Sequence, residues 1–312
     1  MKSCLIILLL VFTARAVVGQ QAQSPPPATQ DGGWQTIDEW MQENIDDDVL
    51  HALKQMDQDK VRRAFGELQQ ALQGTNIYQL TTLKETAAIW VPVLKGYEET
   101  YPFGAWLETH LDYLDAAEKM QARMKESEPA RKPGTKALTA APSLKIQRQV
   151  WVEELKQRPW PPLAKSYVPQ LKKIFLAEQV PTELVWLAEV ESSFDPKARS
   201  PAGAAGMFQL MPDTARDQNL SLFPFDQRLQ PEKSAHAAAC ELRRLHKHFG
   251  DWQLALAAYN VGQGRVDKIL KKQNAHTFDA IARRLPVETQ MYVPKIEATL
   301  LKREGVALAD LK

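Results

Sequence analysis

The chain has 312 residues, of which 44% are hydrophobic and 25% are charged, so it is long enough and apolar enough to bury a sizeable core. Its 39 lysines and arginines and its 38 acidic residues leave a formal net charge of +1. So small a net charge gives no overall field that recruits nucleic acid or an anionic membrane, and we expect no nucleic-acid partner.

The first residues, MKSCLIILLLVFTARAVVGQ, are typical of a secretory signal peptide. Lys2 precedes an apolar run from Cys4 to Phe12, and small residues follow the run. Because the run is too short to span a bilayer, we expect no transmembrane anchor. We assign the signal peptide to residues 1–19 and expect a periplasmic or secreted protein. The alternative is a buried N-terminal helix.

The rest of the chain divides into four segments by composition. Residues 20–33 are rich in Pro, Gln and Gly and predict a flexible leader. Residues 34–125 have helical periodicity, and residues 126–145 have the prolines and charges of a linker. Helical patterns resume in residues 146–312. Since alternating β-branched runs are missing throughout, the predicted fold class is all-α.

Export would leave Cys240 as the only cysteine of the mature chain, which excludes an internal disulfide. Cys240 lies in the apolar run SAHAAACELRRL, so we interpret it as a small core residue. No group of histidines and cysteines has the spacing of a zinc site. We therefore expect no metal and no cofactor.

The segment VPTELVWLAEVES predicts a helix that begins at Pro181 and contains two glutamates. Because successive helix residues turn by about 100°, Glu191 continues the apolar stripe of this helix. The other members of that stripe are Val180, Leu184 and Leu187. Glu189 points to the opposite side, where we expect a solvated carboxylate.

The position of Glu191 favours acid–base chemistry. Burial and the end of a helix both disfavour a negative charge and raise the pKa of a carboxyl group. A carboxylic acid that stays protonated near neutral pH is what a general acid requires. The alternative is a structural ion pair with a lysine or an arginine, which also perturbs a pKa.

Three stretches downstream carry further signals. SPAGAAGMFQLMPDTA (200–215) holds Gly203 and Gly206, which allow close approach of the backbone to a ligand. FGDWQLALAAYNVGQGRV (249–266) predicts a short capped helix that ends near Tyr259 and Asn260. LPVETQMYVPKI (285–296) predicts another helix.

Together with Glu191-Ser192, these stretches resemble the catalytic domain of the lytic transglycosylases of the soluble-lytic-transglycosylase type. The closing stretch is most similar to the membrane-bound transglycosylase D branch. The resemblance covers about residues 146–300; Met207-Phe208 replaces the family's common Leu-Met, and no LysM-like repeat follows. It implies a lysozyme-like helical catalytic domain, which here follows a smaller helical region that matches no family we can name.

The resemblance also implies roles for individual residues. Glu191 matches the single catalytic acid and base of the family. The residues that match substrate-binding positions are Ser192, Ser200, Gly206, Met207, Gln209, Tyr259 and Asn260. By residue chemistry alone, Met207 is equally well explained by core packing, and Tyr259 by a core tyrosine with a satisfied hydroxyl group.

The reaction implied is cleavage of the glycosidic bond between N-acetylmuramic acid and N-acetylglucosamine in peptidoglycan strands. Water is not consumed, and a 1,6-anhydro ring forms. Two alternatives remain: a goose-type muramidase that hydrolyses the same bond, and an inactive peptidoglycan-binding protein. The role of residues 34–125 stays open, with cell-wall enzymes as possible partners. For residues 101–120 (YPFGAWLETHLDYLDAAEKM) the interpretations are a docking helix, an extension of the groove, or plain core.

Overall fold

The computed structural model describes residues 68, 70–84, 87, 91, 95, 101–126, 141–200 and 202–311. The predicted signal peptide, the predicted leader and most of the predicted linker lie outside these residues. Within the described ranges the regular structure is helical, and β pairing is limited to the isolated bridges Arg199–Ala205 and Ala205–Leu210. The all-α prediction is confirmed. None of the described helices combines the length and the apolar composition needed to cross a bilayer.

The helices occur in a simple order along the chain. Those of eight residues or more are α6 (Tyr101–Glu126), α7 (Leu144–Lys156), α8 (Ala164–Ala177), α11 (Pro231–Phe249), α12 (Trp252–Val261), α13 (Gln263–Gln273) and α15 (Val287–Glu304). The shorter ones are η1 (Ile77–Gln79), η2 (Thr81–Leu83), η3 (Thr182–Trp186), α9 (Leu187–Ser192), α10 (Pro212–Asp217), η4 (Gln227–Leu229), α14 (Phe278–Ile281), η5 (Ala282–Arg284) and η6 (Leu308–Asp310). Helix α7 starts at Leu144, inside the range 126–145 that we interpreted as a linker.

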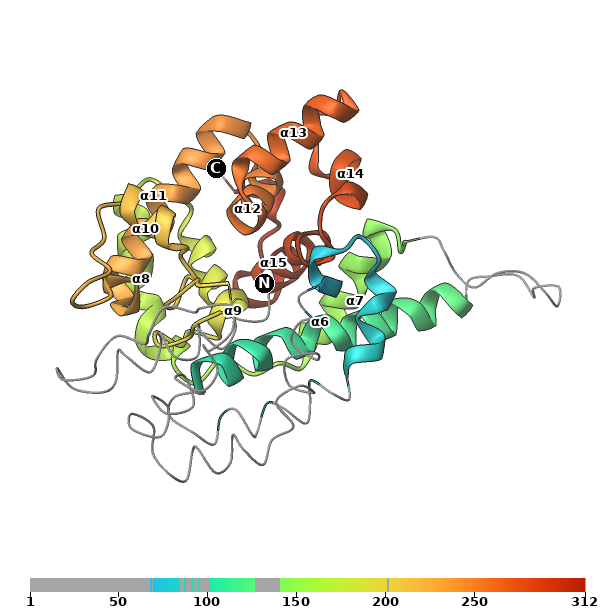
Figure 1. Cartoon of the computed structure of the whole chain (residues 1–312), viewed down its shortest axis with the longest axis horizontal. Helices are drawn as coiled ribbons and strands as arrows, with labels where there is room; N and C mark the ends of the chain where they lie inside the picture. Colours follow the sequence, from blue (N-terminus) through green and yellow to red (C-terminus); the bar gives the residue numbers. More distant parts are fainter. Residues whose placement is uncertain are drawn as a thin grey trace, which may run out of the picture.

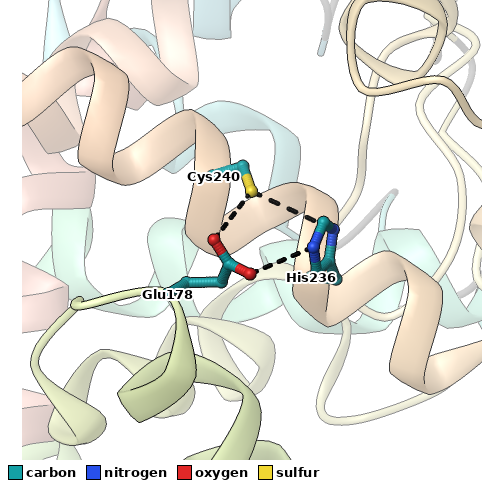
Figure 2. Close-up of side chains that lie close together, drawn as sticks. All are labelled: Glu178, His236 and Cys240. Carbon is teal, nitrogen blue, oxygen red and sulfur yellow. Dashed lines mark hydrogen bonds and ion pairs between the residues drawn. The ribbon is translucent and has the colours of Figure 1, made fainter.

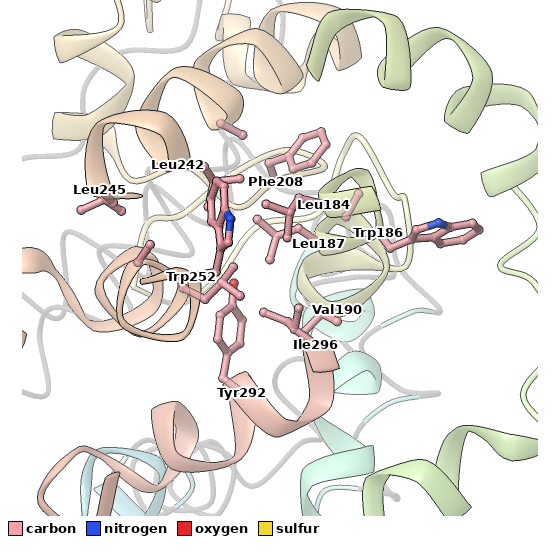
Figure 3. Close-up of a cluster of buried hydrophobic side chains, with 14 of the residues drawn as sticks. Leu184, Trp186, Leu187, Val190, Phe208, Leu242, Leu245, Trp252, Tyr292 and Ile296 are labelled. Carbon is pink, nitrogen blue, oxygen red and sulfur yellow. The ribbon is translucent and has the colours of Figure 1, made fainter. Parts of the chain in front are cut away.

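Helix α15 lies in the middle of the molecule, with α6 and α7 on one side and α8, α11 and α12 on the other (Figure 1). It contributes Val293, Ile296 and Leu300 to a large core that also contains residues of α8, α9, α11 and α12 (Figure 3). Its residues Val287 and Met291 belong instead to a second core. Both cores therefore depend on this one helix.

The second core joins the N-terminal region to the rest of the chain. Leu107 and Leu114 of α6 are buried in it together with Trp151 of α7 and Met291 of α15. The segment before η1 is also attached to α15, because the Val287 backbone N–H donates to the Gly74 carbonyl at 2.7 Å. Part of the region that precedes the linker is thus packed against α7 and α15.

The segment with the two glutamates differs from the single helix that we predicted. Residues Thr182–Trp186 form the 3₁₀ helix η3, and the α-helical part is only α9. Five of its six residues are buried, namely Leu187, Ala188, Glu189, Val190 and Ser192. Only Glu191 is partly exposed, so the side of the helix that carries Glu189 does not face solvent. The expectation of a solvated carboxylate at Glu189 is therefore wrong.

Glu189 forms a buried, bidentate ion pair with Arg303 near the end of α15. The two guanidinium–carboxylate distances are 2.6 and 2.8 Å, and the side chains of Arg303 and Glu189 are only 2% and 3% exposed. Arg303 also donates to the Arg158 and Pro159 carbonyl oxygens, at 3.2 and 2.7 Å. These contacts clamp the end of α15 onto α9 and onto the loop after α7.

We predict that Glu189→Gln destabilises the protein by about 3–5 kcal/mol, because it leaves the buried Arg303 without a counter-charge. The free energy of unfolding is measured by urea denaturation at neutral pH. Glu153→Gln is the matched control, since Glu153 forms an exposed ion pair with Arg123 and should change stability by about 1 kcal/mol or less. Equal losses for the two variants would contradict a structural role for the Glu189–Arg303 pair.

Candidate active site

The carboxyl group of Glu191 lies at a cavity and is held by a tyrosine from α15. Glu191 is the penultimate residue of α9, and the helix stops at Ser193, whose φ of 54° is left-handed. The Tyr292 hydroxyl group donates a hydrogen bond to Glu191 Oε1. One carboxyl oxygen is thereby fixed, and the other is left for a second partner.

Burial raises the pKa of Glu191 to about 8. The hydrogen bond from Tyr292 acts in the opposite direction, as does the positive charge of Lys295, while the negative charge of Glu288 raises the pKa further. Burial disfavours the ionised carboxylate because the cavity cannot solvate it as water does. At neutral pH the group is therefore protonated and able to donate its proton.

The cavity beside Glu191 has a volume of about 200 Å³. Five of the eight site residues predicted from the sequence line it, namely Glu191, Ser200, Gln209, Tyr259 and Asn260. The other lining residues are Leu72, Gln73, Trp106, His110, Tyr113, Val190, Ala202, Ala204, Met211, Glu288 and Tyr292. The structure thus brings together groups from α6, α9, α12, α15 and the loop between α9 and α10.

The remaining predicted residues, Ser192, Gly206 and Met207, do not line the cavity. Ser192 is buried, and its hydroxyl group donates to the Met207 carbonyl at 2.8 Å. The Met207 side chain is fully buried in the large core. These residues hold the loop between α9 and α10 against α9, which sets the position of the cavity wall.

The same loop depends on close backbone packing at Gly206. This residue has a φ of +82°, and a Cβ atom there would lie 1.9 Å from the Arg228 carbonyl oxygen. The buried guanidinium group of Arg228 in turn donates to the carbonyl oxygens of Gly203 and Leu210, both at 2.8 Å. The sequence pointed to Gly206 but gave no signal for Arg228, which is distant along the chain.

Tyr259 and Asn260, at the end of α12, form hydrogen bonds with residues other than Glu191. The Tyr259 hydroxyl group donates to the Phe208 carbonyl at 2.7 Å, and so holds the loop. Asn260 donates from Nδ2 to Glu288 at 3.2 Å and accepts from the Thr289 hydroxyl group at 2.6 Å. The hydrogen bond to Glu191 comes from Tyr292, which lies in the stretch LPVETQMYVPKI but was not singled out there.

Glu288 is a second carboxyl group at the cavity, and sequence reasoning missed it. Burial opposes its ionisation, but contacts with His110, Asn260 and Lys295 outweigh burial and keep its pKa below the ordinary value. The closest approach of His110 Nε2 to Glu288 Oε1 is 3.8 Å. The cavity therefore holds one neutral acid and one anion.

Cys240 belongs to a small polar cluster at the surface between α8 and α11 (Figure 2). Its thiol donates to Glu178 at 3.2 Å, and His236 Nε2 lies 3.0 Å from the same carboxylate. Because Cys240 is only partly buried, its interpretation as a core residue is wrong. The three potential metal ligands lie within 4.8 Å of one another.

An ion-pair network is the interpretation that the geometry of this cluster favours. Arg243 donates to the Glu178 carboxylate at 2.6 Å and thus already supplies a cation. Burial and the neighbouring Glu178 raise the pKa of the Cys240 thiol to about 11, so the thiol keeps its proton within this network at neutral pH.

Comparisons with known proteins concern the part of the chain that carries Glu191. Residues 175–281 match the family model of the transglycosylase SLT domain. The chain is 44% identical over 148 residues to membrane-bound lytic murein transglycosylase D of Escherichia coli (strain K12), a match that covers 45% of this chain and 32% of that protein. It is 35% identical over 122 residues to soluble lytic murein transglycosylase of Salmonella typhimurium, covering 36% of this chain and 19% of that protein.

The chain thus spans about a third or less of the length of these curated relatives. Among solved structures, an inactive variant of the lytic transglycosylase Slt from Pseudomonas aeruginosa aligns with 86% of this chain and 49% of its own. The sequence identity in that alignment is 19% and the TM-score is 0.39.

We predict that Glu191→Gln stabilises the folded chain more at pH 8 than at pH 5. Between the ordinary pKa of 4.5 and the raised value of about 8, the unfolded chain has lost a proton that the folded chain keeps, so native stability falls as the pH rises. Glutamine does not titrate, so the stability difference should grow by about 1.4 kcal/mol per pH unit in this window. Urea denaturation at pH 5, 6, 7 and 8 measures the difference. A constant difference over this range would show that Glu191 ionises with an ordinary pKa.

Proposed function

We propose that this chain, which carries a transglycosylase SLT domain at residues 175–281, is a peptidoglycan lytic transglycosylase. It cleaves the glycosidic bond between N-acetylmuramic acid and N-acetylglucosamine. The observation that carries this proposal is the buried carboxyl group of Glu191, which is protonated at neutral pH and faces a cavity. The names of the relatives, lytic murein transglycosylases, support the substrate class.

Glu191 acts first as the acid and then as the base. Tyr292 holds one carboxyl oxygen, and the proton on the group passes to the glycosidic oxygen as the C1–O bond breaks. The 2-acetamido group of the muramoyl residue stabilises the positive charge that develops at C1. The Glu191 carboxylate then takes the proton from the C6 hydroxyl group, whose oxygen attacks C1. The 1,6-anhydro ring closes, and Glu191 is protonated again.

The remaining cavity residues bind and orient the strand. Ser200, Gln209, Tyr259 and Asn260 are the predicted substrate-binding residues that line the cavity. Asn260 is oriented for this by Glu288 and Thr289, since both ends of its amide group are fixed. Glu288 therefore serves as a positioning residue and, through its charge, helps to keep Glu191 protonated.

A goose-type muramidase is the second candidate, and Glu288 is the observation that favours it. Glycosidases that use water need a second carboxylate to activate that water, and Glu288 is an anion at the same cavity. The products separate the two reactions, because hydrolysis leaves reducing ends and the lytic reaction leaves 1,6-anhydro ends. An inactive binding protein is the third reading, and any catalysed turnover excludes it.

The place of action follows from the substrate. Peptidoglycan lies outside the cytoplasmic membrane, so we propose that the chain works in the periplasm or is secreted, as its signal-peptide-like start predicts. Partner enzymes of the cell wall that bind residues 34–125 stay a prediction.

We predict that Glu191→Gln abolishes turnover of purified murein sacculi while the protein still folds and binds glycan. Glutamine keeps the shape of the side chain but can neither give nor take the proton, and loss of acid–base help costs about 10²–10⁴-fold in rate or more. Mass spectrometry of the digest measures the anhydro-muropeptides, with Glu153→Gln as an exposed control that should digest normally. Normal digestion by Glu191→Gln would remove this residue from the mechanism.

We predict that Glu288→Gln moves the alkaline limb of the pH–rate profile to lower pH. The negative charge of Glu288 raises the pKa of Glu191, so its removal lets Glu191 lose its proton earlier as the pH rises. The profile of kcat/KM is measured on soluble glycan strands, with product analysis at each pH. If Glu288→Gln instead lacked all activity and the parent gave reducing ends, Glu288 would be the base of a hydrolase.

A further inference from the structure

One wall of the cavity is supplied by residues outside the range 175–281 that matches the SLT domain. Helix α6 contributes Trp106, His110 and Tyr113 to this wall, and the segment before η1 contributes Leu72 and Gln73. All five residues precede residue 175 in the sequence, so the match assigns no role to them. Their position beside Glu191 makes them candidates for ligand contact.

This wall is held in place by packing, so it is formed before any ligand arrives. Leu107 and Leu114 of α6 are fully or almost fully buried against α7 and α15. Leu72 belongs to the same core, and the neighbouring Gly74 carbonyl accepts the hydrogen bond from Val287 at the start of α15. Because this wall is already ordered, a ligand that binds to it does not cause a further loss of conformational entropy in these residues.

Trp106 has the surroundings of a stacking platform. Its side chain is partly exposed at the cavity, and its ring packs on the His110 ring with centroids 4.0 Å apart and planes tilted by 33°. Because a carbonyl oxygen only accepts, His110 Nδ1 donates to the Trp106 carbonyl at 2.8 Å. His110 is thus fixed behind the indole, with Nε2 toward Glu288.

We propose that Trp106, backed by His110, forms a sugar-binding subsite against which one N-acetylhexosamine ring of the glycan strand packs, beside the bond that Glu191 cleaves. This inference rests on the proposed function. The faces of a pyranose ring carry C–H groups, and an indole offers them a broad, rigid apolar surface. Polar groups at the same wall, such as the Gln73 amide, suit the hydroxyl and acetamido groups at the rim of the ring.

The subsite has a consequence for kinetics. Trp106 touches the sugar but is not among the groups that move protons, so it contributes mainly to binding of the strand. Removing a contact that is equally strong in the ground state and in the transition state raises KM and leaves kcat nearly constant. A residue that only supported the fold would not give this division between KM and kcat.

The first measurement is binding without turnover. In the Glu191→Gln background, calorimetry with soluble, peptide-free glycan strands gives the dissociation constant. Trp106→Ala should weaken it about ten-fold, and Trp106→Phe, which keeps a smaller ring, by a smaller factor. Phe223→Ala is the matched control, because Phe223 is 86% exposed and does not line the cavity, and it should leave binding unchanged.

The second measurement is steady-state kinetics in the active protein, where Trp106→Ala should raise KM by a similar factor. Thermal melting checks that each variant folds. If Trp106→Ala does not fold, the affinity and KM of Trp106→Phe decide the test. Unchanged affinity and KM in a folded Trp106 variant would overturn the subsite, even if the products are 1,6-anhydro sugars. Weaker binding together with reducing-end products would keep the subsite and overturn the lytic reaction.

Discussion

A protonated carboxyl group at a cavity needs a wall that excludes water and a partner that fixes its orientation, and α15 supplies both for Glu191. Tyr292 in the second turn of the helix donates a hydrogen bond to the carboxyl group, and Glu288 in the first turn accepts one from Asn260. At the far end Arg303 pairs with Glu189, on the same short helix as Glu191. The position of Glu191 therefore depends on two contacts between α9 and α15, one near each end of α15.

The charges around α15 are balanced in the core. Lys295 is 2% exposed, lies 3.2 Å from Asp112 of α6 and sits over the Tyr113 ring at 4.4 Å. Asp112 also accepts from Arg158 at 2.7 Å. Removing one buried charge from such a set lowers the free energy of unfolding by more than the lost hydrogen bonds alone, because the partner charge stays buried and unpaired. Lys295 also lowers the pKa of both Glu191 and Glu288, so one residue of this network acts on stability and on proton chemistry.

Sequence patterns predicted the helical fold and the apolar setting of Glu191, because both are local properties of helix periodicity. The prediction for Glu189 was wrong because periodicity shows which residues share a face, but not whether a second element covers the opposite face. Tyr292 lies 101 residues from Glu191 in the sequence, and His110 is separated from Glu288 by an even longer stretch. Such contacts are decided by the packing of α6 and α15, which no spacing within one helix encodes.

The range that matches the family model leaves out helices on which the site depends. A fragment cut at residues 175 and 281 keeps Glu191 but loses all of α15, and with it Tyr292, Glu288 and Arg303. Its large core would then open where Val293, Ile296 and Leu300 had been, and Glu189 would lie against water instead of a guanidinium group. For protein engineering, the smallest piece worth transplanting therefore runs from the segment before η1, which also packs against α15, to the end of α15.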